Sequence, residues 1–413
     1  MANPGETDLG AEQGLTPART MRAAVIGFVI LMVDGYDSLM AGNIAPLLAH
    51  EWHLQPADIG KLFAICYLGA ILGAVSMGPL ADRFGRRPML LWALALAAVA
   101  TALCAVAPNF PALCLFRFLA GIALGGALPA VSSLTAEHAK RGTRNGTVTL
   151  TFIGYPMGAV VGGAITAGAL QHGWRAIFWG TFLCCVVAFC IAWLLPETYR
   201  ARRGLVEGSL ARRLRVGFTE QFEDGRLMPA LALWLSLFCL MLLVYFLVNW
   251  SPSILVASGS APAIAALAPV FLNLGGIVGA LGLAPAINRF GPYRPVAILA
   301  GVGAFVIAAL GLDHQAVGLT MVLLFIAGIA IMGGQLNFPA MTVDLYPQHV
   351  RGAGAGWTIG MGRVGSIVGP LLGGSLIGAG FGLQSLFLVA TVPALLAAVA
   401  LAAIHIRQRG RRA

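Results

Sequence analysis

Four charged residues lie inside long apolar segments of this chain: Asp34, Asp37, Arg117 and Arg363. A charge near the centre of a bilayer costs at least about 2.5–3.5 kcal/mol, so such a residue usually faces a wet cavity or a partner. Loss of water favours the protonated form of a carboxyl group, which lets a buried acid take up and release a proton. An arginine binds a carboxylate through two parallel hydrogen bonds. These residue types therefore indicate a polar pathway through a membrane.

The composition is that of a membrane protein with many spans. Of the 413 residues, 59% are hydrophobic and 10% are charged, against about 25% charged residues in a soluble domain. The net charge of +10 could suggest a nucleic-acid partner. The basic residues, however, fall in alternate loops, as the positive-inside rule describes, so no nucleic-acid partner is expected. The seven cysteines lie in apolar segments and are interpreted as small packing residues.

Twelve apolar segments are each long enough to cross about 30 Å of hydrocarbon. They lie near residues 22–49, 57–80, 88–107, 111–136, 144–170, 174–195, 229–257, 263–288, 292–311, 316–342, 352–379 and 383–406. We therefore expect an all-α membrane protein with two six-helix bundles. Its predicted parts are a tail (1–21), a bundle (22–195), a linker (196–228), a second bundle (229–406) and a basic tail (407–413).

The orientation follows from the basic residues. The two tails, the linker and the other loops after even-numbered spans hold 22 of the 26 lysines and arginines. This distribution predicts that the linker and both termini are cytoplasmic.

The two halves of the chain resemble each other. The segment GPLADRFGRRP at 78–88 recurs as PAINRFGPYRP at 285–295, and GGALPAVSSL from Gly125 has a weaker counterpart in GGQLNFPAMT from Gly333. The offset of about 206–208 residues is half the chain, which is typical of a duplicated six-span unit.

The first copy of this loop resembles the signature loop of the major facilitator superfamily between spans 2 and 3. Its backbone needs a tight turn, which Gly85 permits, and its acid can face the N-terminus of a neighbouring helix. The resemblance implies a cytoplasmic gate latch, with Lys140 as a further partner at the inner end of span 4. The gating residues expected are Gly78, Asp82, Arg83, Gly85, Arg86, Arg87, Glu137 and Arg141. The alternative is a basic loop that only sets topology.

A second motif narrows the resemblance. Asp34-Gly-Tyr-Asp37 in span 1 is similar to the D-G-x-D signature of the aromatic acid:proton symporters, and Arg117-Phe-Leu-Ala-Gly and residues 339–374 add to this similarity. The resemblance implies the major facilitator fold and proton coupling at Asp34 and Asp37.

Depth along each span allows these charges to share a site. At a rise of 1.5 Å per residue, Asp34 lies roughly 18 Å from the inner face, Arg363 roughly 16 Å and Arg117 roughly 21 Å. Asp37 follows Asp34 by about one turn on nearly the same helix face. Arg363 is the preferred receptor for a substrate carboxylate, whereas Arg117 is expected to pair with one of the two acids. Either arginine, or both aspartates, could instead be purely structural.

Three uncharged residues are further candidates for substrate binding: Tyr36 by ring stacking, and Gln335 and Asn337 by hydrogen bonds to a ring hydroxyl. Taken alone, each is better explained by helix packing or by polar contacts between helices. The glycines of span 5, at 154, 158, 162 and 163, are interpreted as a packing seam.

Proton-driven import of an aromatic carboxylic acid of the hydroxybenzoate, protocatechuate or benzoate type, by alternating access, is the function expected first. An exporter, or a symporter of another small organic acid or metabolite, is the alternative, although span 5 lacks the Gly-Pro signature of exporters. A nontransporting sensor also stays open. An enzyme is not expected, and neither is a cofactor or a metal, since no HExxH motif and no Cys/His cluster occurs. The expected partners are an organic anion, protons and lipid, for a monomer in the inner membrane of a bacterium.

Overall fold

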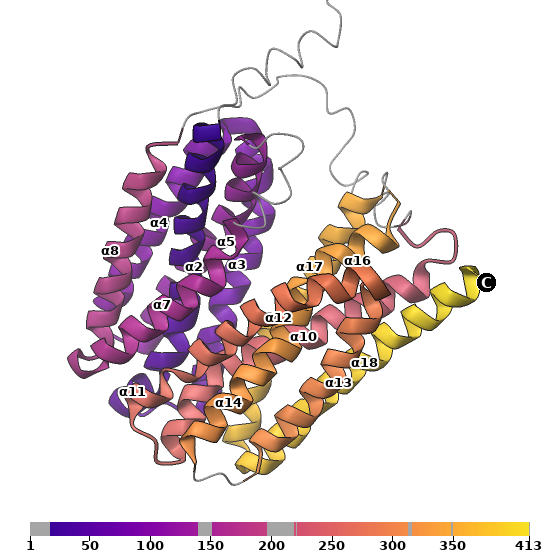
Figure 1. Ribbon diagram of the computed structural model, residues 1–413. Helices are drawn as coiled ribbons and strands as arrows, with labels where there is room; N and C mark the ends of the chain where they lie inside the picture. The colour runs from indigo at the N-terminus through magenta and orange to yellow at the C-terminus, as the bar shows by residue number, and fades with distance from the viewer. Residues whose placement is uncertain are drawn as a thin grey trace, which may run out of the picture. The chain divides into compact units, whose positions relative to one another are not determined.

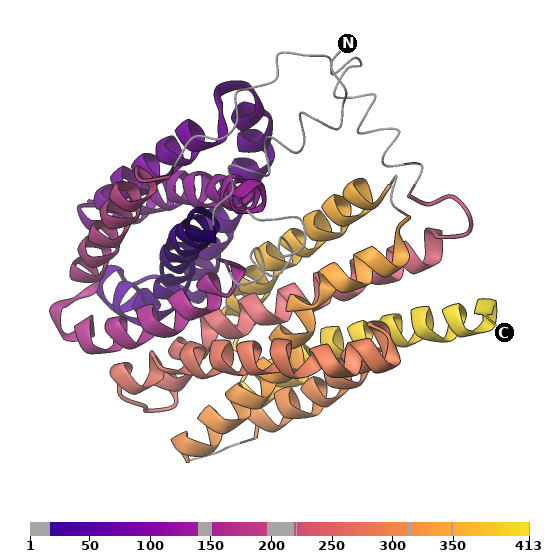
Figure 2. The same cartoon turned by 45° about the horizontal axis from the view of Figure 1, so that its top comes forward.

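The computed structural model describes residues 17–138, 151–195, 219, 221–312, 316–347 and 350–412. These residues are almost entirely helical (Figures 1 and 2). In the first half the helices are α2 (Pro17–Trp52), α3 (Pro56–Phe84), α4 (Arg86–Ala105), α5 (Phe110–His138), α7 (Gly154–Ala169), the 3₁₀ turn η1 (Leu170–His172) and α8 (Trp174–Ala192). In the second half they are α10 (Leu227–Ala257), α11 (Pro262–Ala265), α12 (Ala268–Phe290), α13 (Tyr293–Leu310), α14 (Val317–Ala327), η2 (Gly328–Met332), α15 (Gly333–Leu336), α16 (Phe338–Leu345), α17 (Arg351–Gly378) and α18 (Leu383–Arg412).

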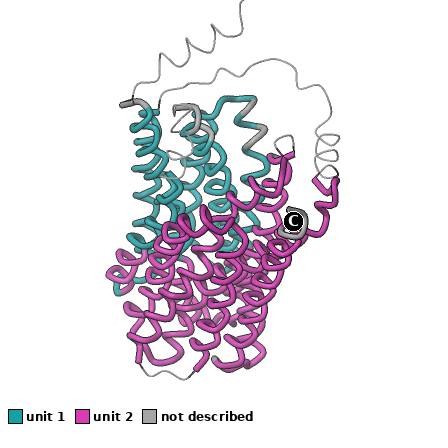
Figure 3. The backbone as a smooth tube through the Cα atoms, turned by 45° about the vertical axis from the view of Figure 1, so that its right-hand side comes forward, with its two compact units in different colours: residues 1–40, 65–162, 171–203 teal, residues 41–64, 163–170, 204–413 magenta. Residues whose placement is uncertain are grey.

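The chain forms two compact units, coloured separately in Figure 3. Unit 1 comprises residues 1–40, 65–162 and 171–203, and unit 2 comprises residues 41–64, 163–170 and 204–413. The end of α2 and the start of α3, within residues 41–64, belong to unit 2 because they pack there. Phe63 of α3, for example, meets Trp250 of α10 edge to face, with ring centroids 5.8 Å apart.

Ten helical segments of the described chain are long and apolar enough to cross a membrane. The other two predicted spans correspond to α7 and α17. Helix α7 is described over 16 residues, fewer than the about 20 that a span needs. Helix α17 has 28 residues and includes the charged Arg363.

Close backbone contacts follow the same pattern in both halves. In unit 1, a side-chain carbon added at Gly69 or Gly73 of α3 would overlap a carbonyl oxygen of α5. In unit 2, Gly275 and Gly279 of α12 stand in the same relation to the carbonyls of Phe325 and Ile329. Small residues at such a seam let two helices approach without intervening side chains.

A second pair of seams repeats in the same way. Gly154 and Gly158 of α7 abut the carbonyls of Phe28 and Met32 on α2, which confirms the predicted packing role of span 5. In unit 2, the glycines of α17 at 365 and 369 abut the carbonyls of Phe238 and Leu242 on α10. The two halves therefore repeat the same helix contacts. These contacts show which residue of one half corresponds to which residue of the other.

The loop motif also ends its helix in the same way in both copies. Gly85 and Gly291 have φ angles of 99° and 79°, a backbone region that glycine enters without steric cost. Each amide donates a hydrogen bond to the carbonyl four residues earlier, Ala81 or Ile287.

The tenth span is not one continuous helix, although the sequence predicts a single segment at 316–342. Helix α14 passes into the π-helical turn η2, and the short helix α15 ends before α16 begins at Phe338. π-Helical turns and breaks of this kind are frequent at functional sites. The break falls at Asn337, and Gln335 lies two residues before it in the short helix α15.

Candidate functional site

The centre of unit 1 contains an ion pair between Asp37 of α2 and Arg117 of α5. Nη1 of Arg117 donates hydrogen bonds to both carboxylate oxygens of Asp37, at 2.8 Å and 3.0 Å. Each side chain is only 2% exposed. Removing one partner of such a buried pair would leave an uncompensated charge, which costs about 3–5 kcal/mol.

The remaining contacts of Arg117 hold its guanidinium group in one orientation. Nη2 donates to the backbone carbonyl of Asp37 at 3.5 Å and to the sulfur of Cys66 at 3.3 Å. The group lies 6.0 Å from the ring centroid of Phe178 on α8. Nε of Arg117 is buried without a hydrogen-bond partner. Three helices besides α5 therefore enclose this side chain.

Asp34 and Tyr36 lie beside the pair on α2. Asp34, one turn before Asp37, is 7% exposed, and Tyr36 is 6% exposed. The Tyr36 ring covers Gly162 of α7 so closely that any side chain there would overlap it. Tyr36 therefore contributes to helix packing in this structure.

The second predicted arginine belongs to unit 2. Arg363 lies in the middle of α17 and is half-buried. Its backbone carbonyl accepts a hydrogen bond from Oγ of Ser366 at 2.6 Å. The structure describes the two units separately, so the predicted sharing of one site by Arg363 and the acids of α2 stays a prediction.

Gln335 and Asn337 lie at the break of the tenth span in unit 2. Nε2 of Gln335 is 3.3 Å from the sulfur of Met241, and its Oε1 is buried without a hydrogen-bond partner. Nδ2 of Asn337 donates to the carbonyl of Gly333 at 2.9 Å and lies 3.4 Å from that of Ala280. Asn337 thus bonds the Gly333 carbonyl at the break, whereas Gln335 retains an unused acceptor.

The gating loop is described in part. Arg83 lies over the ring of Phe84 at 5.3 Å. The guanidinium of Arg87 donates from Nη2 to the carbonyl of Trp193 at 2.6 Å, so it caps the C-terminal end of α8, where helix carbonyls lack partners. The side chains of Asp82 and Glu137 are outside the described part. So are residues 140 and 141, and the expected latch to the inner end of span 4 stays a prediction.

Cys66 and Phe178 are contacts of the ion pair that the sequence did not indicate. Both are apolar residues within spans, and only the spatial neighbourhood of Arg117 reveals them.

Comparison with known proteins identifies the family. The model of the Major Facilitator Superfamily matches residues 27–312 and 287–413. The chain belongs to the Major Facilitator Superfamily. It is therefore a membrane transporter rather than an enzyme.

Two relatives cover nearly the whole chain. The gentisate transporter of Corynebacterium glutamicum is 32% identical over 406 residues, which are 97% of this chain and 90% of the relative. The gallate transporter of Pseudomonas putida is 33% identical over 409 residues, which are 92% of this chain and 90% of the relative. Among solved structures, the nucleoside transporter NupG superposes with a TM-score of 0.75 at 13% identity, over 94% of this chain and 98% of that one. The facilitator fold predicted from the sequence is thus confirmed.

The buried charges of unit 1 have apolar counterparts in unit 2. The glycine seams align the sequences of the two halves. In this alignment Asp34 corresponds to Val244, Asp37 to Leu247 and Arg117 to Leu324. These three counterparts are 5%, 1% and 1% exposed. The same helix contacts therefore form with apolar residues at these positions, so packing alone does not require the ion pair.

Proposed function

We propose that this protein imports an aromatic carboxylic acid of the hydroxybenzoate type together with protons. Two observations support the proposal. The relatives named above are transporters of gentisate and gallate, which are both benzoic acids with ring hydroxyls. The second observation is that the charged positions of unit 1 have apolar counterparts in unit 2. This difference between the two halves is the strongest support for the proposal. Charges that are costly in a membrane and unnecessary for packing are explained by a role in transport.

In the proposed mechanism, Asp37 pairs with Arg117 in one state of the transporter, and binding of a proton to Asp37 weakens this pair. Asp34, one turn away on α2, is the second proton-handling group. Release of Arg117 from Asp37 lets α2 and α5 shift relative to each other. Such a shift couples proton binding to a conformational change, because a ligand moves an equilibrium only through its different affinity for two states.

Recognition of the substrate is assigned to residues of unit 2. The planar fork of Arg363 suits a benzoate carboxylate. Oε1 of Gln335 can accept a hydrogen bond from a ring hydroxyl, and Asn337 is its neighbour at the break. The loop with Arg83, Arg86 and Arg87 resembles the signature loop of the superfamily, and we propose that it latches the cytoplasmic gate.

The proposed location is the inner membrane of a bacterium, with both termini and the linker in the cytoplasm. The bacterial origin of the relatives and the distribution of basic residues support this location.

Uptake of a panel of radiolabelled acids by cells expressing the protein tests the proposal. Hydroxybenzoates, protocatechuate and benzoate should accumulate, and a protonophore should abolish accumulation. Phenol and benzamide serve as controls, because they keep the ring and lack the carboxylate. Accumulation of none of the acids, or accumulation that a protonophore leaves unchanged, would contradict proton-coupled import. If preloaded cells instead lower their internal concentration of the acid below its equilibrium value, the protein is an exporter.

A further inference from the structure

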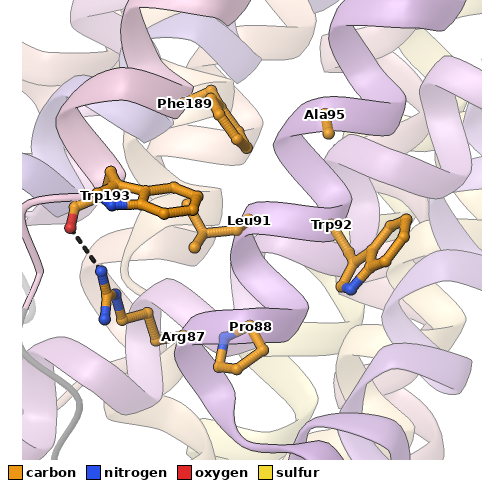
Figure 4. A pocket seen from close by; sticks show the side chains of 7 residues that line it. All are labelled: Arg87, Pro88, Leu91, Trp92, Ala95, Phe189 and Trp193. Atoms are coloured by element: carbon orange, nitrogen blue, oxygen red, sulfur yellow. Dashed lines mark hydrogen bonds between the residues drawn. The ribbon is translucent and has the colours of Figure 1, made fainter.

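Two apolar clefts lie on the surface of unit 1 and share the same stretch of α4. The first, between α4 and the end of α8, has a volume of about 380 Å³. Its lining residues, drawn in Figure 4, are Arg87, Pro88, Leu91, Trp92, Ala95, Phe189 and Trp193. The second has a volume of about 700 Å³ and lies between α4 and the end of α3. Pro88, Trp92 and Ala95 line both clefts.

The walls of both clefts are suited to hydrocarbon. Trp92 is 71% exposed, and Phe84 and Trp193 are 57% and 59% exposed. Large apolar side chains with such exposure are stable where lipid covers them, and tryptophan is typical of the level of the lipid headgroups. From Pro88 to Ala95 the shared wall is about 10 Å long at 1.5 Å per residue. Each cleft can therefore hold part of one extended acyl chain.

A cationic group stands at one end of the first cleft. Arg87 is held in place by its bond to the Trp193 carbonyl, as Figure 4 shows, and its guanidinium lies 5.8 Å from the Trp193 ring. Nε of Arg87 is buried without a hydrogen-bond partner. A buried donor without an acceptor costs about 1–3 kcal/mol, so an anionic oxygen at this position would stabilise the site. Arg86 precedes Arg87 in the sequence, and the exposed Arg83 lies in the last turn of α3, so the loop carries further positive charge.

We propose that the two clefts bind one anionic phospholipid of the bilayer, with an acyl chain in each cleft and the phosphate on Arg87. Two apolar clefts that flank one helix beside a single cationic end match an amphiphile with two chains and one anionic headgroup. The loop that contains Arg87 lies on the side of the membrane where most lysines and arginines of the sequence are expected. Anionic lipids attract such basic segments. A soluble phosphate would satisfy Arg87 but would leave both apolar clefts unfilled.

Native mass spectrometry of the purified, delipidated full-length protein in a nonionic detergent tests the proposal. The protein is titrated with dioleoyl phosphatidylglycerol or with dioleoyl phosphatidylcholine, which have identical chains. We expect preferential binding of phosphatidylglycerol. Arg87→Gln should weaken this binding roughly tenfold, the equivalent of about 1.4 kcal/mol, and should remove the preference. Arg294→Gln is the matched control, because Arg294 lies over the Phe290 ring in the second copy of the loop, and it should bind phosphatidylglycerol as the wild type does.

Further variants keep the test decisive if loss of the α8 cap prevents folding of Arg87→Gln. Ala95→Phe places a ring in the space common to both clefts and should weaken binding of both lipids. Arg87→Lys should keep the preference for phosphatidylglycerol, because the charge is retained. Equal binding of the two lipids by the wild type, or unchanged binding by Ala95→Phe, would overturn the proposal.

Two competitors separate a lipid from other anions. Inorganic phosphate in millimolar excess should not displace phosphatidylglycerol, and a single-chain lysophosphatidylglycerol should bind more weakly than the two-chain lipid. Displacement by phosphate would identify a site for a free anion, and equal affinity of the single-chain lipid would refute the use of both clefts.

Discussion

The Asp37–Arg117 pair permits a thermodynamic test in which two harmful substitutions should partly cancel. Asp37→Asn leaves the guanidinium of Arg117 in a place where it is 2% exposed, and Arg117→Gln leaves the carboxylate of Asp37 equally buried. Each single change should cost about 3–5 kcal/mol, because one charge then lacks its partner. The double variant removes both charges and should recover at least about 2 kcal/mol relative to the sum of the single changes.

The assay is thermal unfolding of the purified protein in detergent, followed with a dye that fluoresces on reaction with thiols. The chain provides buried free cysteines as reporters, among them Cys104, Cys185 and Cys239. The double variant should melt above both single variants. Asn43→Leu is the control, because Asn43 is 3% exposed and neither polar atom of its side chain has a hydrogen-bond partner. This control should melt at or above the wild-type temperature.

A double variant that melts below both single variants would refute the pairing. So would an Asp37→Asn variant that is no less stable than Asn43→Leu, because the carboxylate would then balance no buried charge.

Three further predictions address packing, topology and recognition. Gly158→Ala should lower the melting temperature, because its new carbon would overlap the Met32 carbonyl, whereas Gly168→Ala on the same helix has nothing within 4 Å and should leave stability unchanged or slightly raised. Equal melting of these two variants would contradict the seam. In cysteine-accessibility experiments, residue 210 should be labelled only from the cytoplasm and residue 52 only from outside, and labelling of residue 210 from outside would overturn the proposed topology. Arg363→Lys keeps the charge but loses the planar fork, so binding of the aromatic acid should weaken by about 1–3 kcal/mol at normal expression, and wild-type affinity would remove Arg363 from the site.

The helices and their duplication were predictable because both depend on patterns along the chain. Apolar length sets the spans, and the repeated loop indicates the duplication. The glycines of span 5 at 154 and 158 were correctly assigned to a packing seam. The depth estimate also placed Asp37 and Arg117 at a common level, where the structure joins them.

Other features could not be predicted, for identifiable physical reasons. The choice between Asp34 and Asp37 as the partner of Arg117 depends on helix tilt and rotation, which shift a side chain by as much as the one turn that separates the acids. The partner of Arg87 is a backbone carbonyl of Trp193, and every residue carries such a group, so no side chain marks it. The break in the tenth span lies before Pro339, and its π-helical turn arises from packing that the local sequence does not determine.

Proton movement coupled to an aromatic acid tests the central claim most directly. The purified protein is reconstituted into vesicles, and a pH-sensitive dye reports the external pH after addition of a hydroxybenzoate. Wild-type protein should make the external medium more alkaline as protons enter with the acid. Asp34→Asn should abolish this change while substrate binding persists. Uptake of the acid without any change of external pH, or an unchanged pH response in Asp34→Asn, would contradict the proposed coupling.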